Sequence, residues 1–242
     1  VVGIWVSAFL VLFLISGLSW AGIWGGKMVQ AWSQFPAEKW DAVPLSDDIH
    51  ASMNHHRREV PWALEQTPMP ASGSAAGAAG VAGAVTIDSI DALAREIGFD
   101  ARYQMNLPQD DTGVWTLSRD SMNTDSTDPM SDRTVHIDQH SGNILADVRY
   151  ADYSLAGKAM AVGIALHMGT LGLLSVLANT LVCLSVLFLC VSALVLWWKR
   201  RPTAAGRLSA RPMPSELPLW QGAVLVGLFV SMAFPMAGAV LL

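Results

Sequence analysis

Three long stretches of this chain carry no charged side chain: residues 1–26, 169–198 and 217–242. Each is at least as long as the ~20 residues that a helix needs to cross the hydrocarbon core of a bilayer. Their apolar residues would lie on every side of a helix, not on one face, as is typical of a helix surrounded by lipid. We therefore expect three transmembrane helices, at about 1–24, 173–198 and 218–241.

The basic residues predict which side of the membrane each loop occupies. Five of them crowd the short loop 199–216, in which Glu216 is the acidic residue; they are Lys199, Arg200, Arg201, Arg207 and Arg211. Short loops rich in Lys and Arg stay in the cytoplasm. This places the loop inside and residues 27–156 outside.

The outer segment is acidic. Residues 27–156 hold 9 Lys and Arg against 19 Asp and Glu, a net charge of −10, in a chain whose net charge is −5. Binding to nucleic acid requires cationic side chains, so nucleic acid is excluded as a partner. The charge is typical of a soluble domain carried across a membrane, and it would also attract cationic or metal-bearing ligands.

A run of small residues divides this outer segment. Residues 71–84 read "ASGSAAGAAGVAGA". Small side chains build no core, so we expect a flexible connector between an outer piece at 27–70 and a second one at 85–150.

The second piece has the pattern of a small α/β module. In "DSIDALAREIGF" apolar residues recur at helical spacing, and Asp88 is the expected helix cap. The later stretches "GVWTLSRD" and "RTVHIDQHSGNILADVRY" read as strands, with "DQHSGN" as a hairpin turn. We expect one helix on a short antiparallel sheet, able to fold without the membrane helices.

Most of the histidines and both cysteines have ordinary explanations. The adjacent pair His55 and His56 is expected on a solvated surface, with weak metal binding as the alternative. His136, on a strand, and His140, in a turn, are expected to be structural or exposed. The two cysteines, seven residues apart in one apolar helix, are too distant for a disulfide and are expected to be small packing residues.

His167 is different because it is the one ionisable residue after Lys158 in the stretch "SLAGKAMAVGIALHMGTLGLL". An ionisable side chain near the membrane interior indicates function. Neutral imidazole is a good axial ligand for haem iron, and Gly163 and Gly169 on either side leave room for a flat macrocycle. The alternative is a histidine that is only hydrogen-bonded to a backbone carbonyl.

Several stretches, in order along the chain, resemble the PepSY-associated transmembrane proteins, which include bacterial iron-regulated membrane proteins and siderophore reductases. They are "VVGIWVSAFLVLFLISGLSWAGIWG", "VPWALEQTPMP", "RTVHIDQHSGNILADVRYADYSLAGKAMAVGIALHMGTLG", "VLWWKRRP" and "FPMAGAVLL". The resemblance covers most of the chain and corresponds to the C-terminal portion of the family.

The resemblance implies a fold, a cofactor and an activity. It implies an α-helical transmembrane bundle in the bacterial inner membrane, with a small periplasmic α/β domain of the PepSY type. It also implies b-type haem held by histidines of the transmembrane helices. The family's G-x-x-x-H-x-G histidine corresponds to His167, which is thereby the expected cofactor-binding and metal-ligating residue.

The chain also departs from the family's pattern. The family usually has a histidine just before the segment that begins here at Val1, so we expect this chain to begin inside a longer protein and the second axial ligand to lie upstream. After His167 the family carries a longer tract of Gly and Asn. Here that tract reads "TLGLLSVLANT", in which Asn179 stands in for part of it.

Together these features predict an electron-transfer protein that is embedded in the lipid bilayer and binds haem b. It would reduce ferric siderophore iron in the periplasm. The electron donor and the catalytic residues stay open. The alternative is a non-enzymatic PepSY protein that binds or regulates a periplasmic partner or protease. A transporter subunit is disfavoured because no helix has a buried charged pair or an interrupted apolar run.

The expected organisation follows from these boundaries. Its parts are a transmembrane helix (1–26), a periplasmic segment with a Gly/Ala-rich linker (27–84), a PepSY-like α/β domain (85–156), an interfacial helix followed by a transmembrane helix (157–198), a cytoplasmic loop (199–216) and a further transmembrane helix (217–242).

Overall fold

The computed structural model of the 242-residue chain describes Leu10, Val11, Leu14, Gly17 and residues 43–54, 60–200 and 220–233. The chain divides into two units, Val1–Leu18 with Val182–Leu242 and Ser19–Leu181. Each is described by itself below.

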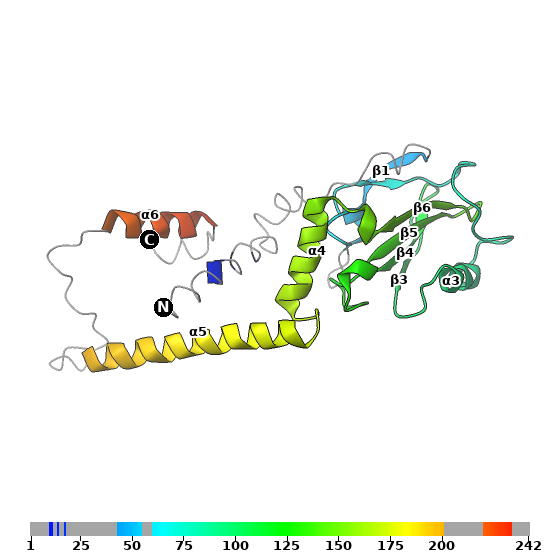
Figure 1. Ribbon diagram of the computed structural model, residues 1–242. Coiled ribbons are helices and arrows are strands. Elements are labelled where there is room, and N and C mark those ends of the chain that lie inside the picture. The colour runs from blue at the N-terminus through cyan, green and yellow to red at the C-terminus, as the bar shows by residue number, and fades with distance from the viewer. Residues whose placement is uncertain are drawn as a thin grey trace. The chain divides into compact units, whose positions relative to one another are not determined.

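Four antiparallel strands in chain order form the main sheet of the second unit (Figure 1). They are β3 (Gln104–Asn106), β4 (Val114–Arg119), β5 (Arg133–Asp138) and β6 (Ile144–Arg149). The predicted hairpin is confirmed: β5 and β6 pair directly, and Gly142 in their turn has a φ of 73°, which favours glycine. In the central register Thr116 pairs with His136, and His136 with Ala146.

Helix α3 (Ile87–Glu96) covers one face of this sheet, as the sequence predicts. Its apolar stripe packs against alternate residues of β4 and β5 in a core formed by Ile90, Leu93, Ala94, Phe99, Trp115, Leu117, Val135 and Ile137. The predicted cap at Asp88 is wrong. The helix is capped by Thr86, whose hydroxyl accepts from the Ser89 N–H, while the Ser89 hydroxyl accepts from the Thr86 N–H.

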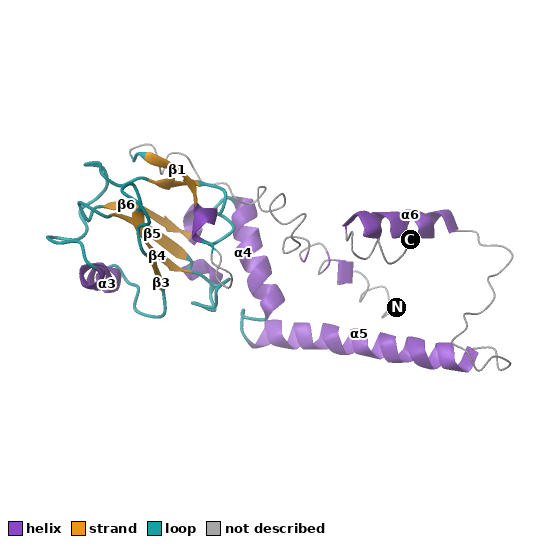
Figure 2. Cartoon of the chain, turned by 180° about the vertical axis from the view of Figure 1, so that it is seen from behind, coloured by secondary structure: helices purple, strands orange, loops and turns teal. Residues whose placement is uncertain are grey.

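The opposite face of the sheet is covered by residues that precede the domain in sequence. Leu64, which is fully buried, packs with Ala63 against Ala146 and Val148 of β6. A two-stranded sheet of β1 (Leu45–Ile49) and β2 (Pro68–Pro70) and the 3-10 helix η2 (His50–Met53) belong to the same layer. Figure 2 shows α3 and β1 on different sides of the four strands.

The expectation of a flexible connector at 71–84 is wrong for the part of it that runs alongside the β5–β6 hairpin. Ala78 forms a β-bridge with Ile144, and the Val81 N–H donates to Gly142 O over 2.9 Å. The Gly73 N–H donates to the Asp138 carboxylate over 2.7 Å. Small side chains let this backbone lie directly against the hairpin, so the segment is bound and not free.

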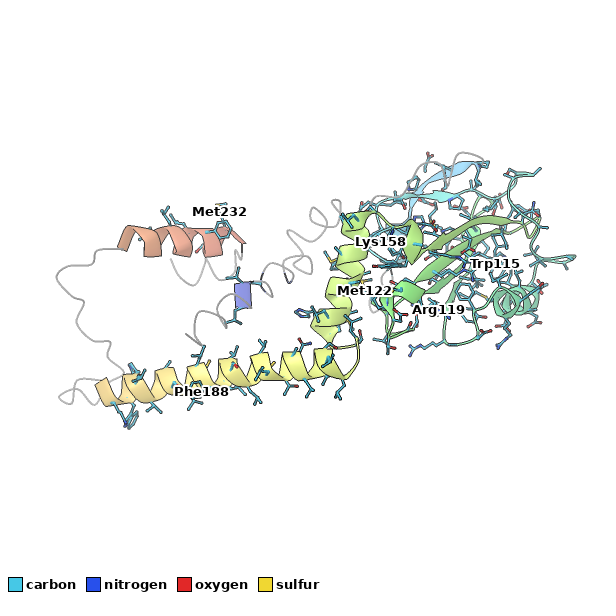
Figure 3. The ribbon with its side chains drawn as sticks, in the orientation of Figure 1. Trp115, Arg119, Met122, Lys158, Phe188 and Met232 are labelled. Atoms are coloured by element: carbon cyan, nitrogen blue, oxygen red, sulfur yellow. The ribbon has the colours of Figure 1, made fainter. Side chains whose placement is uncertain are left out.

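Two helices follow the sheet. The 3-10 helix η4 (Tyr150–Asp152) leads into α4 (Leu155–Met168), and four residues separate α4 from α5 (Leu173–Arg200). α4 packs on the sheet domain through Ile164 and Met160, which meet Trp62 and Met122; Figure 3 shows Met122 beside α4.

Among the described residues, one helix is long and apolar enough to cross a membrane: Leu173–Lys199, with a mean hydropathy of 2.6 and no part of its most apolar window buried. The 28 residues of α5 span about 42 Å, more than the ~30 Å of a hydrocarbon core. Helix α6 (Trp220–Ala233) covers 14 residues of the expected span at 218–241. The expected span at 1–24 lies outside the described residues, apart from the four named above, and so does most of the loop 199–216.

Candidate functional site

His167 is the next-to-last residue of α4, at the point where the chain turns toward α5. Its side chain is exposed. The surrounding chain is apolar: Leu166, Met168 and Leu171 are large hydrophobic residues that expose 40–46% of their surface. An imidazole in this position is accessible to a large ligand that brings its own apolar surface.

The end of α4 is closed by a glycine in the left-handed conformation. Gly169 has a φ of 75°, which other residues rarely adopt. The Thr170 N–H then reaches back to Ala165 O over 2.9 Å. The helix therefore ends at Met168, one residue after His167, and does not continue into α5.

Asn179 of α5 holds the last turn of α4. Its side-chain Nδ2 donates to Leu166 O over 2.9 Å and to His167 O over 3.1 Å. A helix leaves its last carbonyls short of intrahelical donors, and of these two Leu166 O also accepts from the Gly169 N–H over 3.2 Å. These bonds thus fix the backbone of His167 while leaving its imidazole exposed. They also show what Asn179, noted in the sequence as part of the tract after His167, contacts in the structure.

Gly163 lies one turn before His167, on the same side of α4. A Cβ built at Gly163 meets no atom within 4 Å, so the space beside the imidazole is open. At Gly169 a Cβ would lie 3.4 Å from Asn179 Nδ2. The two glycines predicted to make room for a ring thus have different roles: Gly163 leaves open space, and Gly169 allows the turn and the approach of Asn179.

The donors at this site fit a single axial ligand of a haem. An exposed imidazole, open space one turn away and apolar neighbours are what a haem needs on one side. Within the described parts of the chain, no three His, Cys, Asp or Glu side chains are grouped so as to hold a metal ion.

The other predicted residues belong to other elements of the chain. His140 lies in the β5–β6 turn, where its Nε2 is 3.1 Å from Asp111 O. Cys183 and Cys190 are exposed on α5 as free thiols. His55 and His56 lie outside the described residues. His136 is structural as expected, but its partner was not foreseen.

That partner is His50. The two rings are fully buried between the sheet and the layer that precedes it, with their Nε2 atoms 3.0 Å apart. His50 Nδ1 is 2.8 Å from Thr67 O, and His136 Nδ1 is 2.9 Å from Thr116 Oγ1. The sequence offers no local signal for a contact between residues 86 positions apart.

A small, mainly apolar cavity that the sequence does not predict lies where α4 meets the sheet domain. Asp132 and Tyr153 reach it among apolar neighbours, which include Trp62, Met122 and Met160. Its volume of about 20 Å³ suffices for a guest the size of water. The hydroxyl of Tyr153 is buried there without a hydrogen-bond partner among the described residues.

Burial raises the pKa values of the acidic groups in and beside this cavity. It raises the pKa of Asp132 to about 8, although the Ser121 N–H, 2.7 Å away, acts in the opposite direction. Burial likewise raises the pKa of Asp120 to about 6 and that of Tyr153 well above its ordinary value. At neutral pH Asp132 is therefore mostly a neutral acid that can donate a hydrogen bond.

Comparison with known proteins gives one match. The family model described as the PepSY-associated TM region matches residues 1–200, which include both the sheet domain and the junction of α4 with α5. No curated protein and no solved structure matches the chain significantly.

Proposed function

Since this chain belongs to the PepSY-associated TM region family, we propose that it is a haem-b-binding inner-membrane protein that delivers electrons to ferric siderophore iron in the periplasm. The observation that carries the proposal is the junction of α4 with α5. There Asn179 fixes the backbone of the exposed His167, and Gly163 leaves space beside its ring.

The proposed topology has three membrane crossings. Helix α5 is the described span, and the uncharged stretches 1–26 and 217–242 are the other two. The five basic residues of loop 199–216 keep it in the cytoplasm, and the acidic segment 27–156 lies in the periplasm. His167, six residues before α5 begins, is then close to the periplasmic surface, within reach of a periplasmic electron acceptor.

The residues of this chain have separate tasks in the proposed site. The His167 imidazole would supply a nitrogen ligand to the haem iron, and Asn179 limits the motion of the backbone that carries it. Gly163 allows close approach of a planar ring, and the apolar neighbours exclude water. A bound haem supplies one-electron chemistry, and its potential depends on the axial ligand and on exclusion of water.

The outer domain is the proposed contact for the acceptor. Fe(III) is held by hard oxygen ligands that bind Fe(II) less tightly, so one-electron reduction favours release of the metal. The net charge of −10 on residues 27–156 favours cationic or metal-bearing molecules. Which residues contact the siderophore, and which donor reduces the haem, are outside the proposal.

The activity is tested with the full-length protein in liposomes, reduced beforehand with dithionite and freed of excess reductant. A ferric siderophore should reoxidise the haem and release Fe(II) to a ferrous chelator. The gallium complex of the same siderophore has nearly the same size and charge but accepts no electron, so it should leave the haem reduced.

Two results would count against the proposal. Equal reoxidation by the iron and gallium complexes would indicate that residual oxygen, not the siderophore, is the acceptor. A protein that contains no haem, although it is inserted in the membrane, would leave the non-enzymatic alternative, a PepSY protein that binds or regulates a periplasmic partner or protease.

A further inference from the structure

In the buried His50–His136 pair, the hydrogen-bond partners determine which nitrogen of each ring carries the proton. Thr67 O is a carbonyl and can only accept, so His50 carries its proton on Nδ1. His50 Nε2 is then an acceptor, and His136 Nε2 donates to it over 3.0 Å. His136 Nδ1 in turn accepts from the Thr116 hydroxyl over 2.9 Å. The two imidazoles thus share one proton between two nitrogens that face each other.

Both rings are in the protonation state that metals bind. Burial lowers the pKa of His50 to about 4, although its bond to Thr67 acts in the opposite direction. Burial, together with the proximity of His50, lowers the pKa of His136 well below its ordinary value. Metal-ligating histidines usually donate their second ring N–H to a carbonyl or another acceptor, which is the arrangement of His50 and Thr67.

We propose that His50 and His136 form a two-nitrogen binding site for Cu(I), in which the metal ion takes the place of the proton shared by their Nε2 atoms. The displaced proton moves to His136 Nδ1, and the Thr116 hydroxyl turns to accept it. A hydroxyl can donate or accept, so Thr116 satisfies His136 in both states. Binding therefore requires no net release of a proton by the pair.

The ligand set favours Cu(I) over Zn²⁺. Structural zinc takes four ligands, and no group of three or more His, Cys, Asp or Glu side chains is present among the described residues. Cu(I) accepts two nitrogen ligands and also binds soft thioethers. Two thioethers belong to the same layer as His50: Met53 follows it by three residues in η2, on the same side of a 3-10 helix, and packs against the cluster that contains Met69.

Binding requires a small movement of one ring. Metal–imidazole bonds are about 2 Å long, so the two Nε2 atoms must be ~4 Å apart in a linear site, about 1 Å further than they are here. His136 is held in a central strand that pairs on both sides. His50 lies on a four-residue 3-10 helix, so the movement falls on His50.

The test measures Cu(I) retained by the full-length protein in detergent against a chromophoric Cu(I) chelator under anaerobic conditions. Both cysteines are first replaced, as Cys183→Ser and Cys190→Ser, because their exposed thiols would also bind Cu(I). One Cu(I) per chain should be retained. His50→Gln and His136→Gln should each weaken binding more than 10-fold, and Thr116→Val should weaken it 10- to 100-fold, as loss of a ligand's support does.

His140→Gln is the matched control, since His140 is a histidine in a turn of the same domain and should keep the full affinity. X-ray absorption of the copper-loaded parent protein needs no variant, and it should show two nitrogen neighbours at about 2 Å. The proposal is overturned if the parent retains no Cu(I), if either His→Gln protein that keeps the parent's circular dichroism spectrum binds as tightly as the parent, or if the absorption spectrum shows sulfur ligands without nitrogen.

Discussion

The side-chain amide of Asn179 donates a hydrogen bond to the main-chain carbonyl of His167, with 3.1 Å between nitrogen and oxygen. The two residues belong to successive helices, α5 and α4. The bond joins a residue inside the most apolar helix to the backbone of the histidine that stands just before it. It gives the turn between the helices a defined structure, and its consequences can be measured.

Removal of this amide should loosen the end of α4. In Asn179→Ala both carbonyls lose the side-chain donor, although Leu166 O keeps the Gly169 N–H, and we expect a cost of about 1–2 kcal/mol for local opening. Amide hydrogen exchange over residues 165–170 should therefore accelerate about 5- to 30-fold. Thr180→Ala is the control, because the hydrogen bond that it removes goes to Val176 O within α5. Equal acceleration in both variants would show that Asn179 has no particular role.

The two glycines near His167 should respond differently to substitution. Gly169→Ala places a side chain at a φ of 75° and near Asn179, which should cost about 1–2 kcal/mol and lower the melting temperature. Gly163→Leu adds a good helix former in open space, so stability should be unchanged or higher. If a haem lies beside His167, Gly163→Leu should nevertheless reduce haem content. Full haem content in Gly163→Leu would exclude a ring on that side of α4.

Stability should depend on pH through Asp132. Its folded pKa of about 8 lies above the unfolded value of 3.8, so between these pH values only the folded state holds the proton. Stability from this proton is present below pH ~4 and is lost as pH rises through about 8. Asp132→Asn, which stays neutral, should gain stability relative to the parent as pH increases across this window.

Tryptophan fluorescence of the full-length protein in detergent, followed during urea unfolding at several pH values, measures this difference. The buried His50 and His136 have lowered pKa values, so they change the free energy of unfolding with pH in the opposite direction. This effect is the same in both proteins and cancels when they are compared. A difference between Asp132→Asn and the parent that stays constant from pH 4 to pH 8 would contradict a raised pKa for Asp132.

The sheet domain should need the residues that precede it. A fragment of residues 85–156 lacks Ala63 and Leu64, which fill the core on the second face of the sheet. We therefore expect a fragment of residues 43–156 to unfold cooperatively and the fragment 85–156 to lack a cooperative transition. Leu64→Ala in the longer fragment should cost about 2–5 kcal/mol, as for other fully buried leucines. Equal cooperativity of the two fragments would restore the sequence-based expectation of an independent module.

The regular elements of the outer domain could be predicted because their signals are local. The apolar spacing from Ile90 to Leu93 and Ala94 places one face of a helix on a core, and the turn "DQHSGN" joins two strands. The cap was assigned to Asp88 rather than Thr86 because the sequence contains two good capping residues two positions apart, and only the backbone conformation distinguishes them.

The errors concern contacts between distant segments. The run of small residues at 71–84 is bound by its backbone, as in the bridge of Ala78 to Ile144, and backbone bonding leaves no pattern in side chains. The pairing of His50 with His136 and the cavity at Asp132 and Tyr153 depend on how the two layers stack. His167 could be singled out from the sequence because an ionisable residue is conspicuous in an apolar stretch, whereas its support by Asn179 needed the turn at Gly169.

The most direct measurement is the haem content and the reduced-minus-oxidised absorption spectrum of full-length protein with His167→Ala, at equal protein level in the membrane. His140→Ala is the matched control, since it also removes a histidine of the same chain. We expect the parent and His140→Ala to show the same b-type spectrum and haem content, and His167→Ala to lose the haem that His167 ligates. Unchanged haem content and spectrum in His167→Ala would remove His167 from the site and contradict the proposed function of the α4–α5 junction.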